Sequence, residues 1–169
     1  GILFSATEVN NFYSDSWALL IGINEYQYEK QLHYAVADAQ EMKRLLSEKL
    51  GFPDENITIV LDSAATLQGI RRSMENLEKK TSKNDRVLIY FGGHGKTKLL
   101  PDGGEMGFLI PVNGKSSNLL STSLAMSEMK QMSKSIPAKD ILFLMDACYS
   151  GLMGIESMGL DLKDEISLD

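Results

Sequence analysis

The folds open to this chain are limited above all by short apolar runs that alternate with helical patterns. Four such runs occur, at residues 17–23, 57–61, 86–91 and 141–145. They are almost continuously apolar rather than alternating between apolar and polar, which is typical of strands buried on both faces of a sheet. The sequence therefore predicts an α/β fold, a three-layer α/β/α sandwich with a mainly parallel sheet.

Periodic apolar residues predict the helices that cover this sheet. In the segment 34–50 apolar residues recur at steps of four and three, and Gly51 with Pro53 ends the pattern. A second helix is expected to begin after Thr66, whose hydroxyl is a good N-terminal cap. A third helix is expected within residues 122–135, where three methionines form a core-facing stripe.

Two segments lack such a pattern. Residues 96–114 are glycine-rich and contain a turn sequence at 101–104, so we expect a small hairpin or a loop there. Residues 152–169 are polar and spotted with glycine, and we expect a flexible loop. The whole chain, residues 1–169, has the length of a single domain.

Composition excludes several classes of protein. The net charge is −6 without a dense cluster of Lys and Arg, so we expect no nucleic-acid partner. No apolar run approaches the roughly 20 residues of a membrane span, and residues 1–4 lack the basic start of a signal peptide, so we expect neither a signal peptide nor a membrane partner. The single cysteine excludes an internal disulfide and favours a reducing, cytoplasmic location. Because residue 1 is Gly rather than Met, we expect a fragment or a processed product.

Two of the predicted strands lead directly into reactive side chains. The run 141–145 is followed three residues later by Cys148, and the run 86–91 is followed three residues later by His94. The carboxyl ends of parallel strands meet at one edge of a sheet, and a sharp turn at a strand end exposes a nucleophile. A thiol and an imidazole at that edge are the parts of a cysteine nucleophile and its base.

Each of these residues also has a simpler interpretation, a buried structural cysteine and a satisfied histidine. Glycines at 92, 93 and 95 remove side chains around His94, so a substrate backbone can approach closely. The amide of Gly95 is then free to donate to an oxyanion. A phosphate cradle is the rival use of such glycines, but the pattern is neither GxGxxG nor GxxxxGK[ST] and no predicted helix follows it.

Five segments together carry a resemblance to a known family. They are ALLIGIN at 18–24, LHYAVADA at 32–39, YFGGHG at 90–95, IPV at 110–112 and DACYSG at 146–151. Cys148 lies 54 positions after His94, close to the spacing of about 50 residues typical of caspases. The chain resembles the large-subunit portion of a caspase-family cysteine protease (peptidase C14). It is most similar to the metacaspase and bacterial orthocaspase branch.

The resemblance implies roles for the site residues and a set of partners. His94 would be the general base and Cys148 the nucleophile, while the backbone amides of Gly95 and Cys148 would form the oxyanion hole. The substrate would be a protein or peptide. A small-subunit segment of the same protein, C-terminal to this chain, would complete the sheet, and residues 152–169 would lead towards it.

The resemblance also implies which type of residue is accepted directly before the cleaved bond, at the position called P1. Asp38 has a simpler role at the start of a helix, where a carboxylate interacts favourably with the dipole, and Asp146 has one as a strand-terminal carboxylate bound by backbone amides. Metacaspases accept arginine or lysine at P1 and carry acidic residues at these two positions. True caspases instead carry an arginine ahead of the helix, where this chain has Leu32, and a glutamine where it has Asp146. An acidic pocket attracts a cation and repels aspartate.

The resemblance leaves calcium activation with little support, and we expect no resident cofactor and no metal site. Many metacaspases bind calcium through an acidic cluster after the histidine, but here that segment offers only Asp102 and Glu105. Calcium takes six to eight oxygen ligands. Two alternatives remain open at this point. One is a catalytically silent caspase-like interaction module, which the presence of both His94 and Cys148 disfavours; the other is a CHAT-type cysteine protease of the same clan.

Overall fold

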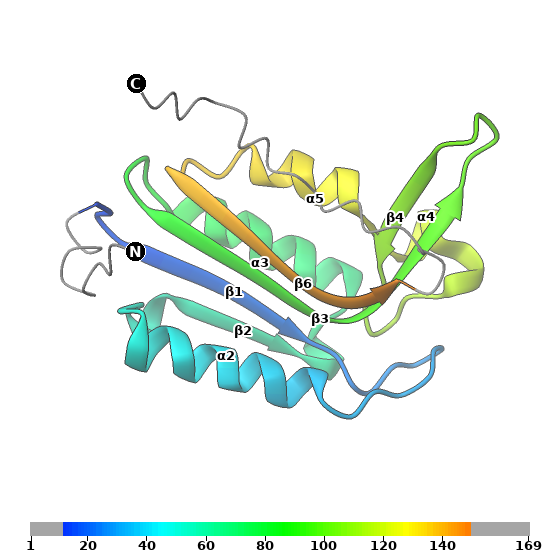
Figure 1. Cartoon of the computed structure of the whole chain (residues 1–169), viewed down its shortest axis with the longest axis horizontal. Coiled ribbons are helices and arrows are strands. Elements are labelled where there is room, and N and C mark those ends of the chain that lie inside the picture. Colours follow the sequence, from blue (N-terminus) through cyan, green and yellow to red (C-terminus); the bar gives the residue numbers. More distant parts are fainter. Residues whose placement is uncertain (1–11, 150–169) are drawn as a thin grey trace, which may run out of the picture.

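The computed structural model describes residues 12–149 and confirms the three-layer α/β/α architecture (Figure 1). The strands are β1 (Ser16–Gly22), β2 (Ile57–Leu61), β3 (Arg86–Leu99), β4 (Glu105–Leu109), β5 (Leu124–Ala125) and β6 (Asp140–Tyr149). The helices are α2 (Ala35–Lys49), α3 (Leu67–Lys80), α4 (Leu119–Thr122) and α5 (Met126–Ser133), and three short 3₁₀ turns span Asp54–Asn56, Asp62–Ala64 and Ser116–Asn118.

The sheet is mainly parallel, as predicted. Strand β1 pairs in parallel with β2 and β3, and β3 pairs in parallel with β6. The remaining strands, β4 and β5, extend the sheet in antiparallel pairs. The parallel strands therefore end together at one edge of the sheet, which is where an α/β fold places its ligand sites.

Helix α2 covers one face of the sheet, and α3 and α5 cover the other (Figure 1). Alternate residues of a strand point to opposite faces. In β1, Leu20 packs with Ala39 and Leu46 of α2, whereas its neighbour Ile21 packs in the core that contains Ile70 of α3. Both faces of the central strands are thus buried, which explains their continuous apolar runs.

Helix α3 begins and helix α2 ends where the sequence predicts. The hydroxyl of Thr66 accepts a hydrogen bond from the Gly69 N–H at 3.0 Å and caps α3. Gly51 follows α2 with φ of +71°, a left-handed conformation that glycine adopts without strain. The methionine-rich segment is more broken than predicted, because residues 124–125 pair with β4 and the helix α5 begins only at Met126.

Two strands run further than the sequence predicts. Strand β3 was expected to end at Phe91, but it continues through the glycines to Leu99, and β6 continues through Cys148 to Tyr149. The predicted strand ends before His94 and Cys148, and the predicted turn at Cys148, are therefore wrong. The two strands pair with each other as far as Gly95 and Tyr149, and this ladder holds the glycines extended. The far end of β3 forms the predicted hairpin with β4.

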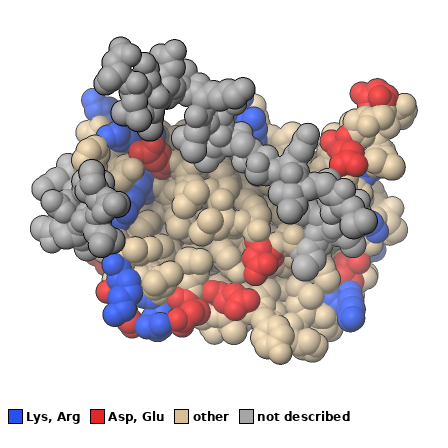
Figure 2. All heavy atoms as spheres, viewed as in Figure 1, with Lys and Arg blue, Asp and Glu red and all other residues tan. Residues whose placement is uncertain are grey.

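Strand β6 lies at the front of the view in Figure 1, and the corresponding middle area in Figure 2 is largely uncharged. Among residues 12–149, β6 pairs only with β3. Its Leu142 is 45% exposed. None of the helices in the described range has the length and apolarity that a membrane crossing requires. The loop predicted at 152–169 lies outside the described residues.

Candidate active site

The register of β3 and β6 brings the two predicted catalytic residues together. His94 of β3 is the Cα partner of Cys148 of β6, and the next pair is Gly95 with Tyr149. Neighbouring strands lie about 5 Å apart. The side chain of Cys148 lies outside the described part of the structure, so the juxtaposition is one of backbone positions. Backbone positions this close are compatible with contact between a thiol and an imidazole.

The imidazole of His94 is held in one orientation by a backbone carbonyl. Its Nε2 lies 2.7 Å from the carbonyl oxygen of Lys30, and the ring is half-buried. Because a carbonyl oxygen only accepts hydrogen bonds, Nε2 must carry the proton. In the neutral ring the other nitrogen, Nδ1, is then free to accept a proton, as a general base must.

Tyr26 fixes the same histidine from a second direction. Its hydroxyl oxygen accepts a hydrogen bond from the His94 backbone N–H at 2.7 Å, and the two rings lie 4.7 Å apart between centroids. Tyr26 is 3% exposed, and this burial raises the pKa of its hydroxyl well above the ordinary value. The hydroxyl therefore stays neutral at any working pH and keeps the strand at His94 in place.

The segment that carries Tyr26 is itself tied to the sheet. The carboxylate of Asp62 accepts hydrogen bonds from the backbone N–H groups of Asn24 (2.7 Å) and Glu25 (2.9 Å). Asp62 adopts a left-handed backbone conformation with φ of +40°, which costs energy and persists only where the surroundings impose it. Tyr26 could not be identified from the sequence, because it acts on a residue 68 positions away and no local pattern indicates such a contact.

A pocket opens beside His94 and Gly95, with Lys30 and Lys96 in its walls. The Glu29 carboxylate also lines it and accepts hydrogen bonds from the backbone N–H (2.6 Å) and the hydroxyl (3.1 Å) of Ser116. Gly95, the predicted oxyanion donor, is thus placed next to the base at the rim of an open space.

Asp38 and Asp146 come to the same face of the sheet from different elements. Gly22, Gly92 and Asp146 occupy one row across β1, β3 and β6. Helix α2 is seated directly on this row, since a Cβ added at Gly22 would lie 2.5 Å from the carbonyl oxygen of Ala35. Asp38 lies in the first turn of that helix. Both aspartates are exposed.

The charges of Asp38 and Asp146 both act on one buried side chain, Tyr90. It is 5% exposed and packs under α2. Burial raises the pKa of its hydroxyl to about 12, and the negative charges of Asp146 and Asp38 contribute to the same increase. The hydroxyl of Tyr90 therefore lies within electrostatic reach of both predicted pocket residues.

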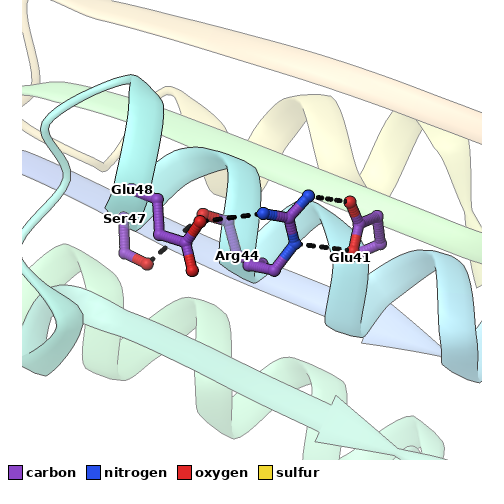
Figure 3. A network of polar contacts seen from close by, with 4 residues as sticks. All are labelled: Glu41, Arg44, Ser47 and Glu48. Carbon is purple, nitrogen blue, oxygen red and sulfur yellow. Dashed lines mark hydrogen bonds and ion pairs between the residues drawn. The ribbon is translucent and has the colours of Figure 1, made fainter.

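The two aspartates have no cation partner in the described residues, unlike two carboxylates on the outer face of α2. On the outer face of α2, Arg44 binds both Glu41 and Glu48 (Figure 3). Within residues 12–149, neither Asp38 nor Asp146 forms an ion pair. The same part of the chain contains no cluster of three or more side chains able to hold a metal ion. The acidic pair is thus available to a cation supplied from outside.

Comparison with known proteins gives consistent results. Residues 15–166 match the caspase domain family. Metacaspase-1 of Ajellomyces capsulatus is 32% identical over 79% of this chain and 40% of its own length. Metacaspase-4 of Arabidopsis thaliana is 34% identical over 52% of this chain and 22% of its own length. The chain thus spans between about a fifth and two fifths of such relatives.

A solved structure supports the fold. Protein GSU0716 from Geobacter sulfurreducens superposes with a TM-score of 0.66 at 22% identity, over 82% of this chain and 52% of that one. At this identity the likeness concerns the fold alone. The match over residues 15–166 includes all the strands and both predicted catalytic residues, and it settles the family. This chain belongs to the caspase domain family.

Proposed function

We propose that this chain is the large-subunit portion of a cysteine endopeptidase that cleaves peptide bonds after arginine or lysine. The observation that carries the proposal is the register of β3 with β6, which pairs His94 with Cys148 at the carboxyl edge of the sheet. The oriented imidazole beside an open pocket supports it further. Relatives named metacaspases are consistent with this chemistry.

In the proposed reaction His94 Nδ1 takes the proton of the Cys148 thiol, and the thiolate attacks the carbonyl carbon of the P1 residue. The backbone N–H groups of Gly95 and Cys148 stabilise the resulting oxyanion. The imidazolium then protonates the leaving amine, which leaves a thioester on Cys148. A water molecule, deprotonated by His94, hydrolyses this thioester. The Lys30 carbonyl accepts a hydrogen bond from Nε2 and keeps the ring oriented during these steps.

A basic P1 residue follows from the acidic pair. Asp38 and Asp146 lie on one face of the sheet, and neither has a cation partner within residues 12–149. A guanidinium presents five donors in a planar fork and can bind two carboxylates at once. An aspartate at P1 would instead meet two like charges.

We also propose that a further segment of the protein pairs with β6. In the described range this strand has one free edge, and its Leu142 is 45% exposed on a largely uncharged area. An unpaired, apolar strand edge is normally covered. A C-terminal small-subunit segment would supply that cover and shape the substrate cleft. A cytoplasmic location and the absence of a required cofactor complete the proposal.

Covalent labelling tests the proposal. A peptide chloromethyl ketone ending in arginine should label the full-length protein at Cys148, as located by mass spectrometry, and Cys148→Ala should remove the label. His94→Ala should slow labelling strongly because the thiol loses its proton acceptor. Labelling elsewhere in the chain, or unchanged labelling of Cys148→Ala, would refute the assignment. A catalytically silent module would remain unlabelled with both residues present.

A further inference from the structure

One buried polar side chain near the acidic pair has no role in the chemistry described above. Tyr90 lies in the middle of β3, and its side chain is 5% exposed. Within residues 12–149 its hydroxyl forms no hydrogen bond. In the same range only Thr97 Oγ1 and Ser123 Oγ are both inaccessible to solvent and without a partner. The Tyr90 hydroxyl can therefore be reached from outside, and a substrate group could bind to it.

The backbone of β3 determines where that hydroxyl lies. Tyr90 and Gly92 are two residues apart in one strand and therefore face the same side of the sheet. A Cβ added at Gly92 would lie 2.9 Å from the Tyr90 hydroxyl oxygen. The side chain thus extends along the strand and occupies the space over Gly92. Since Gly92 is the Cα partner of Asp146, the hydroxyl lies beside the base of that carboxylate.

Helix α2 brings the second carboxylate to the same place. Gly22 is the other Cα partner of Gly92, and the turn of α2 that contains Asp38 is packed on it. The hydroxyl consequently lies between one carboxylate from β6 and one from α2. The charges of both carboxylates act on it, and both favour its neutral form.

We propose that Tyr90 is a specificity-determining residue whose hydroxyl binds the guanidinium of a P1 arginine between Asp38 and Asp146. This inference rests on the proposed function, because it assigns a third group to the same basic-residue pocket. A neutral phenol can donate its proton to a carboxylate and accept a hydrogen bond from a cation at the same time. It therefore connects the two aspartates through the bound substrate without adding charge.

The test compares Tyr90→Phe with the unchanged full-length protein. Two peptides that differ only at P1 are used, one with arginine and one with its neutral isostere citrulline. Phenylalanine keeps the ring and removes only the hydroxyl. Tyr13→Phe is the matched control, since the Tyr13 hydroxyl also lies against a carboxylate, Asp140, at 2.9 Å but at the opposite end of the sheet. The rate of Cys148 alkylation by iodoacetamide is measured in parallel.

We expect Tyr90→Phe to lower kcat/KM for the arginine peptide by about tenfold or more, since a hydrogen bond to a charged group contributes about 1.5–3 kcal/mol. Alkylation and the Tyr13→Phe variant should stay within about twofold of the unchanged protein. An unaltered arginine preference in Tyr90→Phe, or equal losses in peptide cleavage and alkylation, would overturn the role of Tyr90. If the unchanged protein shows no preference for arginine over citrulline, the proposed function itself fails.

Discussion

At the scale of single residues, two buried phenols support the two halves of the candidate site. Tyr26 holds the backbone at His94 through a 2.7 Å hydrogen bond. The negative charges of both predicted pocket carboxylates act on the hydroxyl of Tyr90. Each side chain is less than a tenth exposed, and burial raises the pKa of each hydroxyl. Both therefore act as neutral groups with a fixed position.

We predict that Tyr26→Phe lowers kcat by about tenfold and costs about 1–3 kcal/mol of stability. The change leaves the His94 N–H without its acceptor, and an unsatisfied buried donor carries a penalty of that size. Displacement of His94 should also alter the pH profile of Cys148 alkylation, because a nearby imidazolium favours the thiolate. Kinetics, thermal unfolding and alkylation between pH 5 and 9 provide the measurements.

Tyr28→Phe is the control for this prediction. Tyr28 lies two residues further along the same segment and is 57% exposed. It should change neither kcat nor the alkylation profile. A Tyr26→Phe variant that loses stability but keeps both kinetic properties would show that Tyr26 supports the fold without positioning His94.

At the scale of elements, two glycines, one at the end of β1 and one in the middle of β3, allow the parts of the site to pack closely. Gly22 admits α2 against the sheet, and Gly92 leaves room for the Tyr90 hydroxyl. A side chain at Gly22 would meet backbone rather than the flexible end of another side chain. The position of Asp38 on α2 thus depends on the absence of a Cβ atom at Gly22 of β1.

We predict that Gly22→Ala shifts α2 and reduces cleavage of an arginine peptide. The added Cβ would lie 2.5 Å from the Ala35 carbonyl oxygen, so the helix must move. Overpacking of this kind costs about 1–3 kcal/mol. Urea unfolding and kcat/KM for the arginine peptide measure the two effects.

Ala37→Gly serves as the comparison, because Ala37 is exposed on α2 and this substitution costs about 1 kcal/mol through helix propensity alone. It should reduce stability without changing kcat/KM. If Gly22→Ala and Ala37→Gly lower stability by the same amount and also lower kcat/KM by the same amount, the packing of α2 against Gly22 does not control the P1 pocket.

The elements could largely be predicted where apolar patterns are long and capped. The second strand, Ile57–Leu61, and the Thr66 cap agree with the prediction. The continuation of β3 through Gly92 to Leu99 could not be predicted, since glycine is unfavourable in strands and reads as a turn. Pairing with β6 over this stretch overrides that preference. The contact of Tyr26 with His94 likewise depends on chain topology, which no local pattern encodes.

At the scale of the whole molecule, the described residues form a sheet that is covered on both faces but open at β6. The candidate site lies at the carboxyl end of this same strand. If the proposed function holds, one further segment would cover the open edge and also form walls of the substrate cleft. The matched relatives are longer than this chain, which spans 22% of one and 40% of another, so their sequences contain further segments.

We predict that the 169-residue chain alone is inactive or weakly active, and that co-expression with the proposed small-subunit segment raises activity and solubility. The reason is the free edge of β6, which otherwise invites association between copies. Size-exclusion chromatography and turnover of an arginine peptide measure the two outcomes. Full activity of the isolated chain as a monomer would contradict this expectation.

The most direct test of the central claim is a panel of fluorogenic peptides that differ only at P1, assayed with the full-length protein. We predict cleavage after arginine and lysine and none after aspartate, with all turnover lost in Cys148→Ala. Asp146→Asn should lower kcat/KM for arginine by about tenfold or more, since a hydrogen bond to a charged group contributes about 1.5–3 kcal/mol. Preference for aspartate over arginine, or turnover that survives in Cys148→Ala, would contradict the account.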